Sequence, residues 1–428
     1  MKDILPQLND FDRRAFVAAS ARMAFGVGLL PALESAVAAA PEATGGKAKR
    51  LVYLFMAGAM SHLDTFDLKP GHENQGETRP IATNVPGMQV SHFLPMLSQH
   101  FDKLTVIRSM NTPTGAHLPG EYLMRTSYEQ IATTQHPTIG PWIQRLKGRQ
   151  NRTLPDTVLI STPVTHPGAG FMEPAYSPLP IGDPNRGLEN TKSPTEVTDR
   201  EFDRRMSLVN RFNLQFRRKF KSQDVQAYTD FYGQTIDMLA SEEFRAFDLN
   251  LESEEDRDRY GRNQFGQGCL LARRLIENNV RCVEVSFDGW DMHRDIYSGE
   301  LLPARTRVMD RAVSNLLTDL STKGLLDETL VVLATEFGRS PVMNENAGRD
   351  HHPAAYSICL AGGGIAGGRY YGKSDAAAHR VDEDGVLPAD LNATIATALG
   401  LPLTTTIMSP DGRPFKVAHD GVPIAAIL

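Results

Sequence analysis

Short runs of consecutive apolar residues recur along the chain, and they restrict its fold more than any other feature. These runs span residues 49–56, where the basic pair Lys49-Arg50 leads into the apolar run, and residues 104–107, 157–160, 280–287, 329–335 and 356–360. A strand with one wet face alternates apolar and polar residues, whereas a strand buried on both faces of a parallel sheet is apolar throughout. The runs therefore predict six strands of a mostly parallel sheet with both faces covered.

Helical patterns lie between several of these runs. Residues 302–323 place apolar side chains on one helix face, and Gly324 follows as a typical C-terminal cap. Residues 263–278 predict a second helix, and residues 390–399 predict a third that opens on Asp390 as its N-cap. Strands that alternate with helices predict an α/β fold, with a doubly wound sheet and helices on both faces.

Two regions interrupt this alternation. Residues 161–198 are rich in Pro, Gly, Asn and Ser, which predicts a long surface loop or lid. Residues 199–260 are densely charged and helical in pattern, which predicts a helical insertion or, alternatively, an ordinary solvated helix pair.

The first forty residues have the three parts of a twin-arginine export signal in the right order. Arg13 and Arg14 precede Phe16, a stretch of small apolar residues spans 18–30, and Ala36-Val37-Ala38 is an A-x-A cleavage site. The alternative is a short amphipathic helix that begins a cytoplasmic domain. We predict a signal at residues 1–38, the twin-arginine translocase as a partner, and a mature domain at residues 39–428 that is periplasmic or secreted.

The charge, the apolar segments and the cysteines argue against nucleic-acid binding, a membrane span and a disulfide framework. A net charge of -6 in 428 residues gives no indication of nucleic-acid binding. No segment after the signal reaches 18 apolar residues, so we expect no stable membrane span after cleavage. Cys269, Cys282 and Cys359 lie far apart in apolar surroundings, which predicts buried thiols and no disulfide framework.

Carboxylates and imidazoles cluster next to the predicted strands. The clusters lie at residues 57–67, 288–293, 336–340 and 348–353. In an open α/β sheet, ligands bind beyond the carboxyl ends of the strands. Carboxylate oxygens and imidazole nitrogens suit zinc, manganese or iron and, with more oxygens, calcium or magnesium. One such cluster alone is more often a turn with a surface histidine, but four at matching positions predict a shared metal centre.

These clusters resemble the signature blocks of a bacterial family known as domain of unknown function 1501, which is placed in the alkaline-phosphatase and sulfatase superfamily. The blocks are residues 55–67, Gly289-Trp290-Asp291-Met292-His293, Glu336-Phe337-Gly338-Arg339 and Gly348-Arg349-Asp350-His351, with support from His136-Pro137, Tyr260-Gly261, residues 272–275 and residues 361–364. The resemblance covers essentially the whole mature chain and implies an alkaline-phosphatase-like fold.

The resemblance also implies a set of metal ligands. Matched residue by residue, these are Asp64, Asp291, His293, Glu336 and His351, with His352 as the alternative to His351. They imply one or two divalent ions, without distinguishing zinc, manganese, calcium or magnesium.

Two departures from the superfamily pattern put one metal site in doubt. Asp291-Met292-His293 stands where Asp-x-x-x-His is usual, and Glu336-Phe337 stands where Asp-His is usual, which removes an imidazole. One site is therefore altered or lost unless a substitute ligand completes it. The candidates for that substitute are Asp350, Asp67, His62 and His117.

The attacking group is less clearly marked. Thr114 is the nearest hydroxyl to the position of the superfamily nucleophile, and a helix N-terminus there would favour an anion. Alternatively, Thr112 and Thr114 cap the helix and His117 is a metal ligand. No Cys-x-Pro-x-Arg occurs, which argues against the formylglycine chemistry of true sulfatases. Arg339 and Arg349 either clamp the ester oxygens or form structural salt bridges.

These observations lead to two hypotheses of different classes. The first is an exported metal-dependent hydrolase of phosphate or sulfate esters, small or polymeric, in which Thr114 or a hydroxide on the metal attacks. The second is a non-catalytic periplasmic binding or assembly protein on a degenerate scaffold of the same kind.

Overall fold

A computed structural model describes residues 45–188, 200, 201, 204, 207, 208, 211, 238, 239 and 241–428. The predicted signal at residues 1–38 lies outside the described residues, as does most of the predicted insertion at 199–260. From the described part of that insertion come two 3-10 helices, η4 (Glu242–Phe247) and η5 (Leu249–Leu251), and the helix α6 (Glu254–Tyr260).

An eight-stranded sheet runs through the described chain in the order β12-β4-β11-β8-β1-β7-β5-β6. Neighbouring strands are parallel except at β11, which is antiparallel to both β8 and β4. The strands are β1 (Arg50–Met56), β4 (Leu104–Met110), β5 (Thr157–Ile160), β6 (Leu179–Ile181), β7 (Cys282–Phe287), β8 (Thr329–Ala334), β11 (Tyr356–Ala361) and β12 (Arg369–Tyr371). The predicted α/β fold with a mostly parallel sheet is confirmed, and all six predicted strands belong to this sheet.

The unbroken apolar run of β1 reflects burial on both faces of the sheet. Val52, Leu54 and Met56 belong to one core cluster, whereas the alternate residues Leu51 and Phe55 belong to the other. All five side chains are fully buried. Because successive side chains of a strand point to opposite faces, only a sheet with two covered faces requires such a run.

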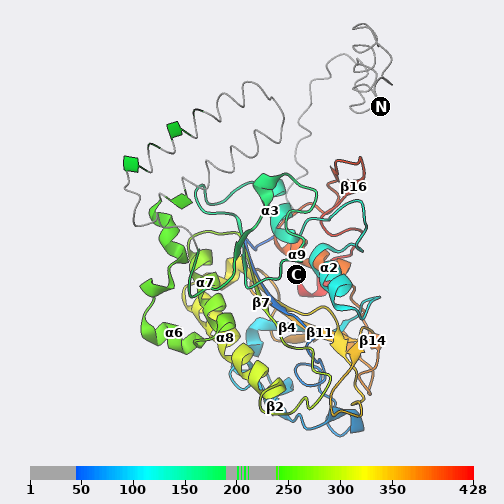
Figure 1. The fold of residues 1–428 in the computed structure, drawn as a ribbon. Helices are drawn as coiled ribbons and strands as arrows, with labels where there is room; N and C mark the ends of the chain where they lie inside the picture. The colour runs from blue at the N-terminus through cyan, green and yellow to red at the C-terminus, as the bar shows by residue number, and fades with distance from the viewer. Residues whose placement is uncertain are drawn as a thin grey trace, which may run out of the picture. The chain divides into compact units, whose positions relative to one another are not determined.

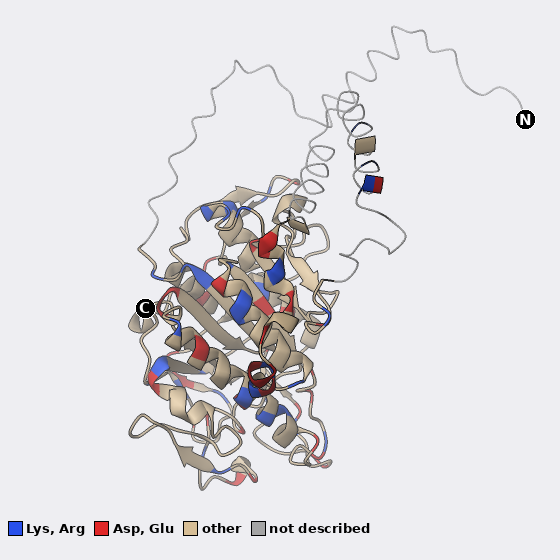
Figure 2. Cartoon of the chain, turned by 90° about the vertical axis from the view of Figure 1, so that its left-hand side faces the viewer, with Lys and Arg blue, Asp and Glu red and all other residues tan. Residues whose placement is uncertain are grey.

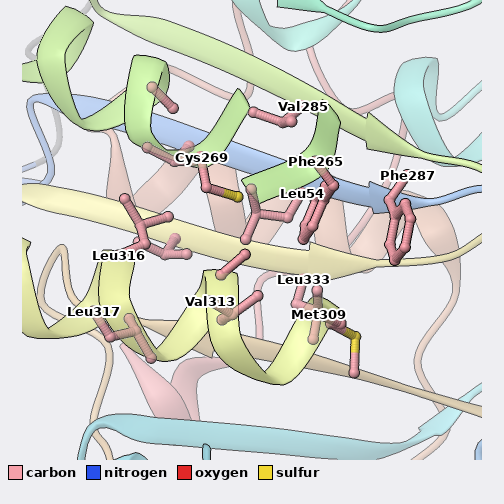
Figure 3. Packing of buried hydrophobic residues seen from close by; sticks show 14 of the residues in the cluster. Leu54, Phe265, Cys269, Val285, Phe287, Met309, Val313, Leu316, Leu317 and Leu333 are labelled. Carbon is pink, nitrogen blue, oxygen red and sulfur yellow. The ribbon is translucent and has the colours of Figure 1, made fainter. Parts of the chain in front are cut away.

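Helices cover both faces, as Figure 1 shows. On one face lie α7 (Gln264–Glu277) and α8 (Leu302–Thr322), and on the other lie α2 (His117–Thr126), α3 (Ile139–Lys147) and α9 (Pro388–Ala398). In Figure 3, residues of α7 and α8 pack on Leu54, Val285 and Leu333, which come from three adjacent parallel strands. The Cys269 thiol is part of this core, and all three cysteines are buried and free, as predicted.

Four short two-stranded ribbons complete the regular structure of the described chain. They pair β2 (Pro80–Ala82) with β3 (Gln89–Ser91), β9 (Gly338–Arg339) with β10 (His351–His352), β13 (Lys373–Ser374) with β14 (Val381–Glu383), and β15 (Ile407–Met408) with β16 (Pro414–Phe415). The β9–β10 ribbon joins two of the predicted signature blocks, because Arg339 pairs with His351.

The start of α9 differs from the prediction. The helix begins at Pro388 and its N-cap is Leu387, so the predicted N-cap role of Asp390 is wrong. Asp390 lies three residues after the cap, and its side chain accepts a hydrogen bond from the Leu387 N–H at 3.0 Å. A carboxylate in the first helical turn stabilises the helix from this position as well.

The predicted loop at 161–198 is described as far as residue 188. It is mostly irregular, apart from the 3-10 helix η3 (Pro174–Tyr176) and β6, which adds an edge strand to the sheet. His166 ties the loop to the sheet, because its Nε2 lies 3.0 Å from the Glu284 Oε2 atom on β7.

Residues of both charges are interspersed on the side of the molecule that Figure 2 shows. Arg259 of α6, for example, lies 2.9 Å from Asp319 of α8. Within the described residues, no helix has the length and apolar character that a membrane crossing requires.

Candidate metal centre

The carboxyl ends of β1, β7 and β8 lie side by side and carry the candidate ligands. Asp291 and His293 follow β7, and Glu336 follows β8. His351 lies on β10, and His117 is the first residue of α2. Because the three strands are parallel neighbours, their ends meet at one edge of the sheet, and side chains from distant parts of the sequence converge there.

A single carboxylate oxygen, Asp291 Oδ1, lies among three imidazole nitrogens. It is 2.9 Å from His293 Nε2, 3.2 Å from His351 Nε2 and 3.4 Å from His117 Nε2. The Nε2 atoms of His293 and His351 are 3.0 Å apart. Two ligand atoms of a tetrahedral zinc ion with bonds of about 2.0–2.1 Å are separated by roughly 3.4 Å. His117, Asp291 and His351 therefore offer ligand atoms that are close enough together to hold one divalent ion, and His293 Nε2 lies beside two of them.

Each of the three imidazoles is held through its other nitrogen. The Nδ1–oxygen distances are 2.7 Å from His117 to Glu336 Oε1, 2.8 Å from His293 to Asp350 Oδ1 and 2.7 Å from His351 to Gly115 O. Carboxylate and carbonyl oxygens only accept hydrogen bonds, so Nδ1 carries the proton and the Nε2 lone pair faces the centre. His117 Nε2 has no hydrogen-bond partner within the described residues. Histidines that bind metals are typically oriented in this way.

Family comparison agrees with the signature blocks. A family model described as "Protein of unknown function (DUF1501)" matches residues 48–428. The chain belongs to this family. The resemblance inferred from the sequence is thereby confirmed. No match was found among curated proteins.

Solved structures similar to this DUF1501 protein include three that share 9–12% sequence identity with it. A protein in the alkaline phosphatase superfamily from Vibrio parahaemolyticus has 10% identity and a TM-score of 0.45, and 91% of this chain and 72% of that chain are covered. The lipoteichoic acid synthase LtaP from Listeria monocytogenes has 9% identity, a TM-score of 0.38 and coverages of 84% and 74%. The PsFucS1 sulfatase from Pseudoalteromonas sp. has 12% identity, a TM-score of 0.36 and coverages of 82% and 68%.

Glu336 contacts His117, a candidate ligand of the DUF1501 centre, on the side away from the centre. Its carboxylate is fully buried and accepts hydrogen bonds from Gly58 N at 2.8 Å, from the Thr335 hydroxyl at 3.1 Å and from His117 Nδ1. The bond to Glu336 also raises the pKa of His117 above its usual value, against the effect of burial. The resemblance implied a ligand at Glu336, whereas the structure shows His117 facing the centre and Glu336 orienting it.

Asp64 lies apart from the three imidazoles and forms a buried ion pair. Arg349 Nε donates to it at 2.7 Å, and both side chains are fully buried. Hydroxyl groups of Ser61, Thr78 and Tyr297 donate at 2.6–2.8 Å. The carboxylate of Asp64 and the guanidinium of Arg349, named as a ligand and an oxyanion clamp in the sequence, are thus engaged with each other.

Arg339 lies inside the centre and contacts Asp291, one of its candidate ligands. Its side chain is fully buried, and its Nη2 atom donates to Asp291 Oδ1. Burial alone would raise the pKa of Asp291, but the hydrogen bond and charge of Arg339, with a contribution from His351, lower it to about 2. Asp291 is therefore held in its ionised form, the form that binds a metal.

The other candidates named from the sequence lie outside this group. Thr114 accepts a hydrogen bond from Ala116 N at 3.2 Å and lines a groove of about 830 Å³ along α2. His352 contacts His379 O at 2.5 Å, and His62 contacts Ala378 O at 3.1 Å. Asp67 is paired with Lys69 at 3.0 Å. Asp350, by contrast, joins the centre as the partner of His293.

Proposed function

We propose that this DUF1501 protein is a metal-dependent hydrolase of phosphate or sulfate esters and acts after export. The observation that carries the proposal is the set of three imidazole lone pairs around one ionised carboxylate oxygen. His117, Asp291 and His351 each offer a ligand atom, and these three atoms lie within 4.8 Å of one another. The superfamily in which the family is placed contains hydrolases of this kind, which directs the proposal to phosphate and sulfate esters.

The centre is open to a substrate. The Asp291 side chain is 46% exposed, and the His117 and His351 side chains are partly exposed. A divalent ion at this place would bind a non-bridging oxygen of the ester and offset the charge that develops in the transition state. The residues of the chain supply the fixed ligand geometry, because Glu336, Asp350 and Gly115 O restrain the three rings before a substrate arrives.

The contacts around the centre favour a water molecule as the nucleophile. Within the described residues, no serine, threonine or cysteine side chain is hydrogen-bonded to His117, Asp291, His293 or His351. The Thr114 hydroxyl accepts a hydrogen bond from Ala116 N, close to the start of α2. The same observation also favours the second candidate, a non-catalytic binding protein, because no hydroxyl among the described residues is hydrogen-bonded to the four side chains.

A panel of aryl esters separates the two candidates. We expect metal-loaded wild-type protein to hydrolyse at least one of an aryl phosphate monoester, an aryl phosphate diester and an aryl sulfate, and Asp291→Ala to show no turnover. The Asp288→Ala variant changes an exposed carboxylate in the same loop and should retain the wild-type rate. Metal-loaded protein that turns over none of the three esters above the Asp291→Ala background would favour the binding protein.

A further inference from the structure

A buried guanidinium group lies where four polypeptide segments of the centre meet. Arg339 Nε donates to Ala59 O at 2.9 Å, and Nη2 donates to Gly58 O and Asp291 Oδ1. Nη1 donates to Arg349 O at 3.1 Å and lies 3.3 Å from His293 Nε2. All three guanidinium nitrogens therefore have partners, and the side chain is fully buried.

The partners of Arg339 are the kinds of atom that would otherwise bind a metal ion. They comprise three backbone carbonyl oxygens, one carboxylate oxygen and one imidazole nitrogen. Gly58 and Ala59 come one residue after the end of β1, at the same sheet edge as Asp291. Oxygen-rich groups of this kind are typical of divalent-cation sites, but here they already surround a fixed positive charge.

A second metal ion does not fit beside the first. Asp64, the other carboxylate at this edge, is engaged by Arg349 and by three hydroxyl groups. A divalent ion placed among the carbonyl oxygens of Gly58, Ala59 and Arg349 would displace the guanidinium or be repelled by it at short range. The side chains of His117, Asp291, His293 and His351 thus offer ligand atoms for one ion. The other carboxylate and the carbonyl oxygens at this sheet edge are already hydrogen-bonded to Arg349 and Arg339.

We propose that Arg339 takes the place of a second metal ion, so that the centre binds a single divalent ion per chain. This inference rests on the proposed metal-dependent function and specifies its metal content. Arg339 is a positioning residue, since its Nη2 atom donates to Asp291 Oδ1 and directs that oxygen towards the three imidazoles. A lysine could not replace it, because one ammonium group cannot reach acceptors on three segments, as the planar guanidinium does.

Metal stoichiometry tests the inference on the wild-type protein. Folded, tag-free protein is stripped with a chelator, titrated with Zn²⁺ and separately with Mn²⁺, and analysed by calorimetry and by elemental analysis after desalting. We expect one equivalent per chain. Two equivalents would overturn the inference and leave the proposed function standing, whereas no bound metal would overturn both.

The Arg339→Ala variant tests the role of the guanidinium itself. It should bind the first ion about 10–100-fold more weakly, the usual effect of losing a group that orients a ligand. It should also accept a second, weaker equivalent in the vacated space, and added methylguanidinium should restore the affinity and exclude that equivalent. The control is Arg125→Lys, which changes another buried arginine and should keep one equivalent at wild-type affinity.

Wild-type affinity in Arg339→Ala, with no effect of methylguanidinium, would overturn the role given to Arg339. If Arg339→Ala does not fold, the wild-type stoichiometry still decides between one ion and two.

Discussion

Asp291→Ala is expected to weaken divalent-metal binding by at least about 100-fold and to abolish ester hydrolysis. Asp291 Oδ1 is the oxygen that lies within 3.4 Å of all three imidazole Nε2 atoms. Its removal deletes the charged ligand and also leaves the Arg339 guanidinium without a counter-charge beside the vacated position. Loss of a group behind a ligand lowers affinity 10–100-fold in typical metal sites, so loss of the ligand itself should exceed that range.

Competition with a chromophoric zinc chelator measures this loss. Asp288→Ala is the matched control, because Asp288 is an exposed carboxylate of the same loop whose side chain bonds to its neighbour Gly289 N. We expect the control to bind zinc as the wild type does. Equal zinc affinity in wild type and Asp291→Ala would show that the metal, if bound, lies elsewhere.

Glu284→Gln is expected to lower the free energy of unfolding by about 3 kcal/mol. Glu284 lies on the fully buried, mostly apolar strand β7, and its carboxylate accepts from Arg125 Nε at 2.9 Å. Both side chains are buried, so removal of one charge leaves the other poorly compensated. Loss of one partner of a buried pair typically costs about 3–5 kcal/mol. We expect a cost at the lower end of this range because Arg125 keeps its hydrogen bond to Glu121 in the variant.

The effect of Glu284→Gln depends on pH in a defined direction. Burial alone would raise the pKa of Glu284, but Arg125 and His166 together lower it to about 2. A carboxylate with a lowered pKa in the folded state adds stability above its ordinary pKa, and that stability is lost as the pH falls through the folded value. The difference between wild type and variant should therefore be full at pH 5–7 and shrink towards pH 2.

Urea unfolding at several pH values measures this difference. Glu121→Gln is the control, because it removes the other carboxylate of Arg125, an i,i+4 partner in α2 that is less buried than Glu284, and it should cost less than Glu284→Gln. A Glu284→Gln variant as stable as the wild type at neutral pH would contradict the account of this pair.

The strands were predictable because their signal is local and redundant. Because both faces of β1, β7, β8 and β11 are buried, their residues are apolar or have a buried polar partner. Runs of this kind can be recognised in a short stretch of sequence. The reversed direction of β11 could not be predicted in this way, because the run of apolar residues has the same composition in either direction.

The ligand set was only partly predictable. Asp291 and His293 follow the end of β7, and His351 lies on the short strand β10. The structure brings these three side chains together. His117 was named from the sequence only as an alternative. Its role depends on the start of α2 and on Glu336, which lies 219 residues away in the chain. A contact at such a separation leaves no mark in local sequence.

For Asp64 and Glu284, the sequence shows the carboxylate but not its partner. Asp64 has the right place after β1, but its environment is decided by Arg349, which lies 285 residues further along the chain. Glu284 was passed over inside the predicted strand at 280–287. A lone carboxylate in a buried strand does carry a signal, since it requires a cationic partner, but only the fold identifies that partner as Arg125.

The central claim, that His117, Asp291, His293 and His351 surround one divalent ion, is tested most directly by anomalous diffraction. Crystals grown with zinc would be measured above and below the zinc absorption edge. The account predicts one strong peak per chain at bonding distance from Asp291 Oδ1 and the neighbouring imidazole Nε2 atoms. A peak beside Asp64, or zinc-loaded crystals with no peak among these four residues, would contradict it.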